Sequence, residues 1–168
     1  MTRSVFLYIL FIALFITGCS ASIPEPESPK STPEAPKSTP ETSKSLPSLD
    51  GSWMIKMTHS GGIMGLARSI EISSDGKYIV TDERASETSS SELTADELSK
   101  LKKLVSSSEY IPASQPNGMG CADCFIYDLE IEENGEKFNI QLNDVSLPAS
   151  GLETLVTHLR GLLEAELK

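Results

Sequence analysis

The chain has 168 residues and a formal net charge of −10 at pH 7. Such an acidic balance argues against nucleic acid as a partner, because nucleic-acid binding needs clustered Lys and Arg. It argues equally against adsorption on anionic lipid head groups. Once the biased N-terminal segments are set aside, residues 51–168 are enough for one modest hydrophobic core.

The N-terminus has the features of a secretory signal. A basic start precedes an unbroken apolar run from Val5 to Ile16, which is too short for a bilayer-spanning helix of about 20 residues. The segment Ile16-Thr17-Gly18-Cys19 resembles the bacterial lipobox. The resemblance implies that residues 1–18 are a signal peptide and that Cys19 carries the lipid. The alternative is an ordinary signal peptide cleaved nearby, in which Cys19 has no special role.

Lipidation of Cys19 predicts a location at the membrane. Several acyl chains of the palmitate kind anchor a protein durably, since each buried methylene contributes about 0.8 kcal/mol. The expected place is the extracytoplasmic face of the cell membrane, and no cofactor is expected besides the lipid anchor. Residue 20 is Ser rather than Asp, which by the lipoprotein sorting rule implies the outer membrane if the host has two membranes.

Residues 19–50 are predicted to be the lipidated Cys followed by a disordered linker. Seven of the ten prolines lie between Ser20 and Leu49, among Ser, Thr, Glu and Lys, and Pro-Lys-Ser-Thr-Pro-Glu occurs at 29–34 and again at 36–41. Without aromatic side chains, this segment cannot bury enough apolar surface to offset the entropy of ordering. We therefore predict a spacer, with a proline-rich ligand or a sugar-attachment site as the alternatives.

The globular domain, 51–168, opens with predicted antiparallel strands. Apolar and polar residues alternate in three successive segments, namely 52–58, 66–73 and 77–82. A glycine-rich turn at 61–65 joins the first two, and Asp75-Gly76 is a hairpin signal between the second and third. Residues 84–92 are polar and rich in Ser, which predicts a loop.

A helix and a hairpin are predicted next. Thr94 and Glu97 form a capping box at the start of the helix, and its buried stripe is Leu98, Leu101, Leu104 and Val105. A long loop follows. The clearest strand is 123–132, where apolar and acidic residues alternate, and Asn134-Gly135 is a strong signal for a tight hairpin. The return strand contains Phe138, Ile140 and Leu142.

The last predicted element is a helix that follows a second capping box, Ser150 and Glu153. Its apolar face is Leu152, Leu155, Val156, Leu159, Leu162 and Leu163. The order is therefore three strands, a helix, two strands and a helix. This order predicts an α+β fold in which an antiparallel sheet of about five strands is covered on one face by two helices.

Few residues of this chain suit catalysis, so we do not expect an enzyme. His59 and His158 are the two histidines, and they have no metal-ligand spacing. His158 lies beside the leucine stripe of the last helix and is expected to be structural, whereas His59 closes the first strand and has a possible role beside the turn. The sequence has no nucleophile elbow, P-loop or dinucleotide-binding fingerprint. Glu130 and Glu132 share a strand face, which a solvated sheet surface explains.

Cys121-Ala-Asp-Cys124 leaves three interpretations open. With Cys19 lipidated, two thiols remain in an oxidising compartment, which favours a disulfide that fixes the long loop to the next strand. The second interpretation is a soft-metal site that uses both thiolates with Met119 or Asp123. The third is a redox pair, although the helix whose N-terminus would lower a thiol pKa is missing from the pattern.

The ordered motifs of the domain resemble the emfourin family. Ser60-Gly61-Gly62-Ile63-Met64-Gly65 looks like its Ser-Gly-Gly-x-x-Gly signature, and the later matches are the helix at 95–106, Asp123-x-Phe125-x-Tyr127, Asn134-Gly135 and Leu147-Pro148. The family is named for a bacterial proteinaceous inhibitor of protealysin, a thermolysin-like zinc metallopeptidase. This chain departs from the pattern by its lipid anchor, by extra polar residues around 74–92, and by the Cys pair.

The resemblance implies that the domain binds and inhibits a secreted thermolysin-like metallopeptidase. The implied contact residues are Ser60, Gly61, Gly62 and Gly65, with Asp123 nearby, because glycine lets backbone approach a cleft closely. A competing interpretation is that these glycines merely satisfy positive φ in a hairpin. The alternative function is a non-inhibitory binding module of the cell envelope that takes a soft metal through Cys121 and Cys124.

Overall fold

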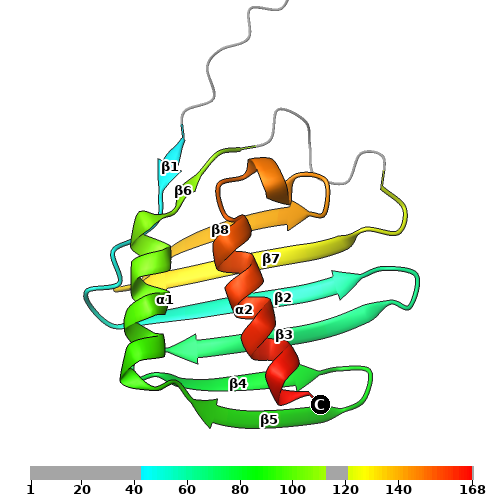
Figure 1. The fold of residues 1–168 in the computed structure, drawn as a ribbon, viewed down its shortest axis with the longest axis horizontal. Coiled ribbons are helices and arrows are strands. Elements are labelled where there is room, and N and C mark those ends of the chain that lie inside the picture. The colour runs from blue at the N-terminus through cyan, green and yellow to red at the C-terminus, as the bar shows by residue number, and fades with distance from the viewer. Residues whose placement is uncertain (1–42, 113–120, 168) are drawn as a thin grey trace, which may run out of the picture. The chain divides into compact units, whose positions relative to one another are not determined.

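Six strands form one antiparallel sheet in the computed structural model, which describes residues 43–112 and 121–167 (Figure 1). All of these residues belong to one compact unit, Thr39–Lys168. The order across the sheet is β5-β4-β3-β2-β7-β8. In this order the strands are Glu87–Glu92, Lys77–Asp82, Leu66–Ser73, Trp53–Gly61, Phe125–Glu133 and Glu136–Asn143.

The neighbouring strands β2 and β7 bury alternate side chains on one face of the sheet. Across their register Ile55 lies opposite Ile131, and Met57 lies opposite Leu129. All four side chains are at most 1% exposed. Because fully burying such a side chain contributes about 1.5–3 kcal/mol, this face anchors the fold. The register also joins segments that are far apart in the sequence.

Helices α1 (Ala95–Ser107) and α2 (Glu153–Glu166) cover the apolar face of the sheet (Figure 1). The predicted capping box is present at α1, where the Thr94 hydroxyl accepts from the Glu97 amide at 3.3 Å and the Glu97 carboxylate accepts from the Thr94 amide at 2.8 Å. The buried helix residues are Leu101, Val105, Leu155, Val156, Leu159 and Leu163. The predicted α+β class is therefore confirmed.

The sheet has one more strand than the sequence predicted, because part of the segment expected to be a loop, 84–92, is strand β5. Residues Glu87–Glu92 pair with β4 along their whole length. The segment lacks apolar residues because it lies at the sheet edge. On its helix side, the Ser89 hydroxyl instead donates to the Glu166 carboxylate at 2.9 Å.

The predicted second capping box does not form. Helix α2 begins after Leu152, and no side chain caps it. Ser150 instead ends a short 3₁₀ helix, η1 (Leu147–Ala149), where its hydroxyl donates to the Leu147 carbonyl at 2.7 Å and accepts from the Leu152 amide at 3.0 Å. Pro148 in the first turn of η1 favours this earlier start. Ser150 therefore connects two helical turns rather than opening one.

The packed domain begins before the expected boundary at residue 51. Strand β1 (Lys44–Ser45) pairs with β6 (Glu109–Tyr110), and Leu46 and Leu49 are 8% and 0% exposed. The end of the segment predicted as linker, 19–50, is thus part of the core. The predicted signal peptide 1–18, Cys19 and the linker as far as residue 42 lie outside the described residues. Within the described part of the chain, no helix is long and apolar enough to span a membrane.

Candidate functional site

One end of the sheet carries the segments to which the sequence analysis assigned a function. The glycine turn (62–65) joins β2 to β3, and a second turn (83–86) joins β4 to β5 at the same end (Figure 1). The Cys loop (121–124) leads into β7 there, and the segment 144–146 follows β8. We call these segments together the turn end. The predicted glycine turn and the Cys pair are therefore neighbours.

Gly61 and Gly62 are required by packing inside the turn end. Their φ angles are +94° and +68°, a region that L side chains rarely adopt. A Cβ on Gly61 would lie 2.5 Å from the Cys124 carbonyl oxygen, and one on Gly62 would lie 2.6 Å from the Phe125 ring. These glycines let the turn pack against the start of β7, as the competing interpretation of a positive-φ hairpin requires.

Hydrogen bonds fix the shape of the glycine turn. The Gly62 amide donates to the Cys124 carbonyl at 3.1 Å, and the Gly65 amide donates to the Gly62 carbonyl at 2.9 Å. The Arg84 guanidinium donates to the Met64 carbonyl from the neighbouring turn. That turn is itself held by the buried Asp82 carboxylate, which accepts from the Arg84 and Ala85 amides, each at 3.0 Å.

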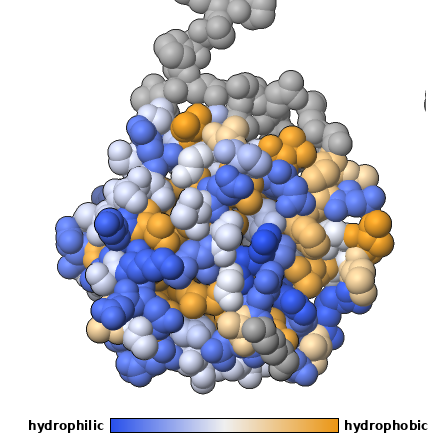
Figure 2. Space-filling view, in the orientation of Figure 1, coloured by the Kyte–Doolittle hydropathy of each residue, from blue (hydrophilic) through white to orange (hydrophobic). Residues whose placement is uncertain are grey.

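The tip of the glycine turn exposes two large apolar side chains that the sequence analysis did not select. Ile63 is 86% exposed and Met64 is 79% exposed. Val145 and Ile126 at the same end are 71% and 37% exposed, and hydrophobic atoms gather at this end in Figure 2. We call Ile63, Met64, Val145 and Ile126 the apolar rim. The sequence does contain a signal for these exposed side chains: two adjacent apolar residues stand between glycines, where a turn normally has polar residues.

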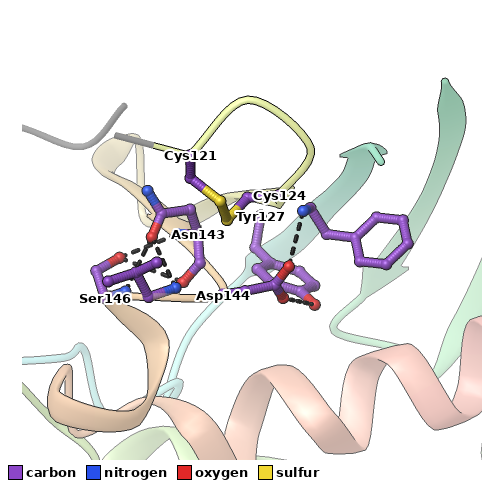
Figure 3. The surroundings of a disulfide bond; sticks show 8 residues. Cys121, Cys124, Tyr127, Asn143, Asp144 and Ser146 are labelled. Carbon is purple, nitrogen blue, oxygen red and sulfur yellow. Dashed lines mark hydrogen bonds between the residues drawn. A yellow bond between two sulfur atoms is a disulfide. The ribbon is translucent and has the colours of Figure 1, made fainter. Parts of the chain in front are cut away.

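Val145 is also held in place by local hydrogen bonds. The Asn143 side-chain oxygen accepts from the amides of Val145 and Ser146 at 3.0 and 2.9 Å (Figure 3). The Asn143 amide in turn donates to the Ser146 hydroxyl at 3.0 Å. An Asn that bonds the backbone two and three residues ahead fixes a tight turn. The exposed apolar side chain of Val145 is therefore presented from a defined backbone.

The structure brings the remaining predicted contact residues to the turn end, in different settings. Ser60 lies on the open face of β2, and its register partner is Ile126 of the apolar rim. A Cβ on Gly65 would meet nothing within 4 Å, so this position is open. Asp123 is exposed within the Cys loop, two residues before Phe125, which pairs with Gly61. Ser60, Gly65 and Asp123 are accessible to a partner, whereas Gly61 and Gly62 pack inward.

Cys121 and Cys124 are joined by a disulfide, with their Cα atoms 5.4 Å apart (Figure 3). A soft-metal site through both thiolates needs the reduced form, and Met119 lies outside the described residues. Across 43–112 and 121–167, no group of three or more His, Cys, Asp and Glu side chains is arranged to hold a metal ion. Strand β7 follows Cys124, so a helix N-terminus does not activate this thiol.

A partly buried polar cluster, in which His59 and Tyr127 are buried and Asp144 is exposed, lies beside the turn end. His59 is 6% exposed, and its ring packs edge-on against Phe125 at 4.8 Å between centroids. The Tyr127 hydroxyl donates to the Asp144 carboxylate at 3.1 Å and accepts from Arg160 at 3.3 Å, while the Phe125 amide donates to Asp144 at 2.8 Å (Figure 3). Asp144 thus ties the start of β7 to the segment after β8.

The electrostatics of this cluster favour a neutral His59. Burial, followed by the positive charge of Arg160, lowers the pKa of His59 below its ordinary value of 6.5. Burial also raises the pKa of Tyr127. Among the described residues, the Nε2 atom of His59 has no hydrogen-bond partner. The sequence predicts that His59 closes the first strand, whereas β2 continues to Gly61. The surroundings of His59 are those of a structural residue.

Comparison with protein-family models finds no match for this chain, and comparison with curated protein sequences finds none either.

Proposed function

We propose that this chain is a lipid-anchored lipoprotein of the cell envelope whose domain binds and inhibits a thermolysin-like metallopeptidase through the turn end. The observation that carries the proposal is the display of Ile63 and Met64 on a turn whose backbone is fixed by hydrogen bonds to Cys124 and Arg84. The order of motifs that resembles the emfourin family supplies the class of partner.

The physical case starts from preorganisation. A flexible segment loses entropy when it binds, whereas a turn already held in one shape loses little. Apolar side chains at the centre of an interface carry most of the binding energy, and burying one in a partner's pocket contributes about 1.5–3 kcal/mol. Ile63 and Met64 are exposed on such a preorganised turn, where a partner's pocket could bury them. Gly65 leaves open space beside them, so that backbone of a cleft edge can approach.

The anchor follows from the motif at Cys19. Lipidation there would tether the domain at the extracytoplasmic face of the membrane, in the compartment where a secreted peptidase acts and where the Cys121–Cys124 disulfide is stable. The test of this part is metabolic labelling with palmitate. We expect label in the wild-type protein and none in Cys19→Ser, which should also leave the membrane fraction. Equal fractionation of both proteins contradicts the anchor.

The inhibition test uses the full-length protein purified in detergent and peptide hydrolysis by a thermolysin-like metallopeptidase. We expect the wild-type protein to slow hydrolysis. The double variant Ile63→Asp with Met64→Asp should bind at least about tenfold more weakly, since each 1.4 kcal/mol lost is a factor of ten. The matched control is Ile79→Asp, because Ile79 is 49% exposed and lies on the open face of β4 away from the turn end.

The assay also separates inhibition from simple binding. Capture of the peptidase without slower hydrolysis would favour the alternative of a non-inhibitory binding module of the envelope. An inhibition constant that Ile79→Asp changes as much as the double variant does would show that the turn end is not the contact surface. If the wild-type protein neither binds nor slows such a peptidase, the proposal is wrong.

A further inference from the structure

The disulfide and the glycine turn are coupled through one backbone group. The Cys124 carbonyl accepts a hydrogen bond from the Gly62 amide at 3.1 Å, so the residue that forms one end of the disulfide also supports the turn. We propose that the redox state of Cys121–Cys124 controls the shape of the glycine turn and thereby the binding of a partner at the turn end. The consequence for a peptidase rests on the proposed function, whereas the control of the turn does not.

The close fit between the two segments makes the turn sensitive to the position of Cys124. Gly61 and Phe125 form the last register pair of β2 and β7, so Cys124 lies just beyond the ladder. The turn packs so tightly there that even a Cβ on Gly61 would meet the Cys124 carbonyl oxygen at 2.5 Å. A small rotation of the Cys124 peptide would therefore break the hydrogen bond from Gly62 or push against Gly61.

The effect of reduction is expected to be local. The stabilisation that a disulfide gives through the unfolded chain grows with the length of the closed loop, and this bond spans a sequence separation of 3. The hydrophobic core, which lies under the helices, does not depend on it. Since Phe125 is fixed separately by the hydrogen bond that its backbone amide donates to the Asp144 carboxylate, the freedom gained on reduction falls on the Cys loop and on the turn that Cys124 supports.

The bond is open to exchange with an external thiol. Cys121 and Cys124 are both partly exposed, and Ala122 and Asp123 between them are exposed. A dithiol reductant of the envelope would attack one sulfur as a thiolate and form a mixed disulfide, while the other cysteine leaves as a thiolate and takes up a proton. The second thiol of the reductant then displaces the first cysteine. Two electrons and two protons pass to the protein, and the reductant becomes a disulfide.

The experiment measures amide hydrogen exchange in the full-length protein in detergent, with and without dithiothreitol. We expect exchange of the Gly62 amide to accelerate about fivefold or more on reduction. This factor corresponds to loss of the net free energy that one hydrogen bond contributes to protection from exchange. The internal control is the Asn134 amide, which donates to the Ser52 carbonyl at 3.0 Å at the opposite end of the sheet and should not change. The double variant Cys121→Ser with Cys124→Ser should behave as the reduced protein does.

The binding experiment uses the double variant in place of the reduced protein, because dithiothreitol would itself bind the zinc of a metallopeptidase through its thiols. We expect the double variant to inhibit more weakly than the oxidised wild-type protein. Unchanged Gly62 exchange overturns the inference, and so does equal acceleration at Gly62 and Asn134, which would mean global loosening. Equal inhibition by the variant and the oxidised protein overturns control of binding. Faster Gly62 exchange when no form inhibits supports control of the turn and contradicts the proposed function instead.

Discussion

The imidazole of His59 stacks on the ring of Tyr127, with 4.9 Å between ring centroids and 16° between ring planes. The two residues are also direct register partners on β2 and β7. Beside them, Phe125 packs against the imidazole and would touch a Cβ on Gly62. Phe125 therefore links the stack to the glycine turn, and a charge on His59 would affect both the fold and the proposed contact surface.

This buried imidazole predicts a loss of stability in mild acid. Burial lowers the pKa of folded His59 below 6.5, so the unfolded chain takes up the proton at a higher pH than the folded chain does. Just below pH 6.5 the unfolded state binds more protons, and the free energy of unfolding therefore rises with pH. The stabilisation is fully present above the ordinary pKa and is lost as the pH falls through the folded pKa.

We expect the urea midpoint of the full-length protein to fall between about pH 7.5 and 5, and His59→Phe to reduce that fall. The charged groups that act on this imidazole are Arg160, Glu164, Asp144 and Arg68. His158, whose pKa is also lowered by burial, contributes in the same direction. A variant in which both histidines are Phe should therefore be nearly independent of pH in this window. An unchanged pH dependence in that double variant contradicts the assignment.

The glycines of the turn are predicted to differ in their tolerance of alanine. Gly65→Ala adds a methyl group in open space at φ +60° and should destabilise by about 1 kcal/mol. Gly61→Ala, at φ +94°, has at least this backbone penalty and in addition forces a Cβ against the Cys124 carbonyl, so we expect about 2–4 kcal/mol. Urea denaturation of both variants measures the difference. Equal losses would show that the turn does not pack against Cys124 as described.

Asp144 and Tyr127 offer a matched pair of substitutions. Tyr127→Phe removes the hydroxyl that donates to Asp144 and accepts from Arg160, and should cost about 0.5–1.5 kcal/mol. Asp144→Ala also leaves the Phe125 amide without its acceptor, so it should cost about 1–3 kcal/mol and raise exchange of that amide. A larger loss for Tyr127→Phe than for Asp144→Ala would contradict the role of Asp144 as the link between β7 and the segment after β8.

The sequence predicted most of the elements whose pattern is local, although the local capping box at Ser150 does not form. Alternation along 123–132 and the capping box at Thr94 depend on neighbouring residues, and both appear in the structure. Strand β5 was missed because its Ser-rich edge position needs no apolar side chains. The contact of His59 with Tyr127 depends on the register between strands that are distant in the sequence, which no local pattern encodes. The contact role of Gly61 and Gly62 is implied by the family resemblance and stays a prediction, and the exposed side chains of the same turn are those of Ile63 and Met64.

The last prediction concerns where the domain begins. Leu49 is fully buried, although composition places it in the proline-rich segment. Its φ of +61° is unusual for a non-glycine residue, and the surrounding core must offset that cost. We expect Leu49→Ala to destabilise by about 2–5 kcal/mol, as large-to-small core substitutions do, and the exposed Ser48→Ala control to change stability by less than about 0.5 kcal/mol. Urea denaturation of the full-length variants provides both values.

A chain shortened to residue 51 would lose the side chain of Leu49 together with that of Leu46, and should therefore unfold at a lower urea concentration than one that begins at residue 43. Equal midpoints would show that these leucines add nothing to the core.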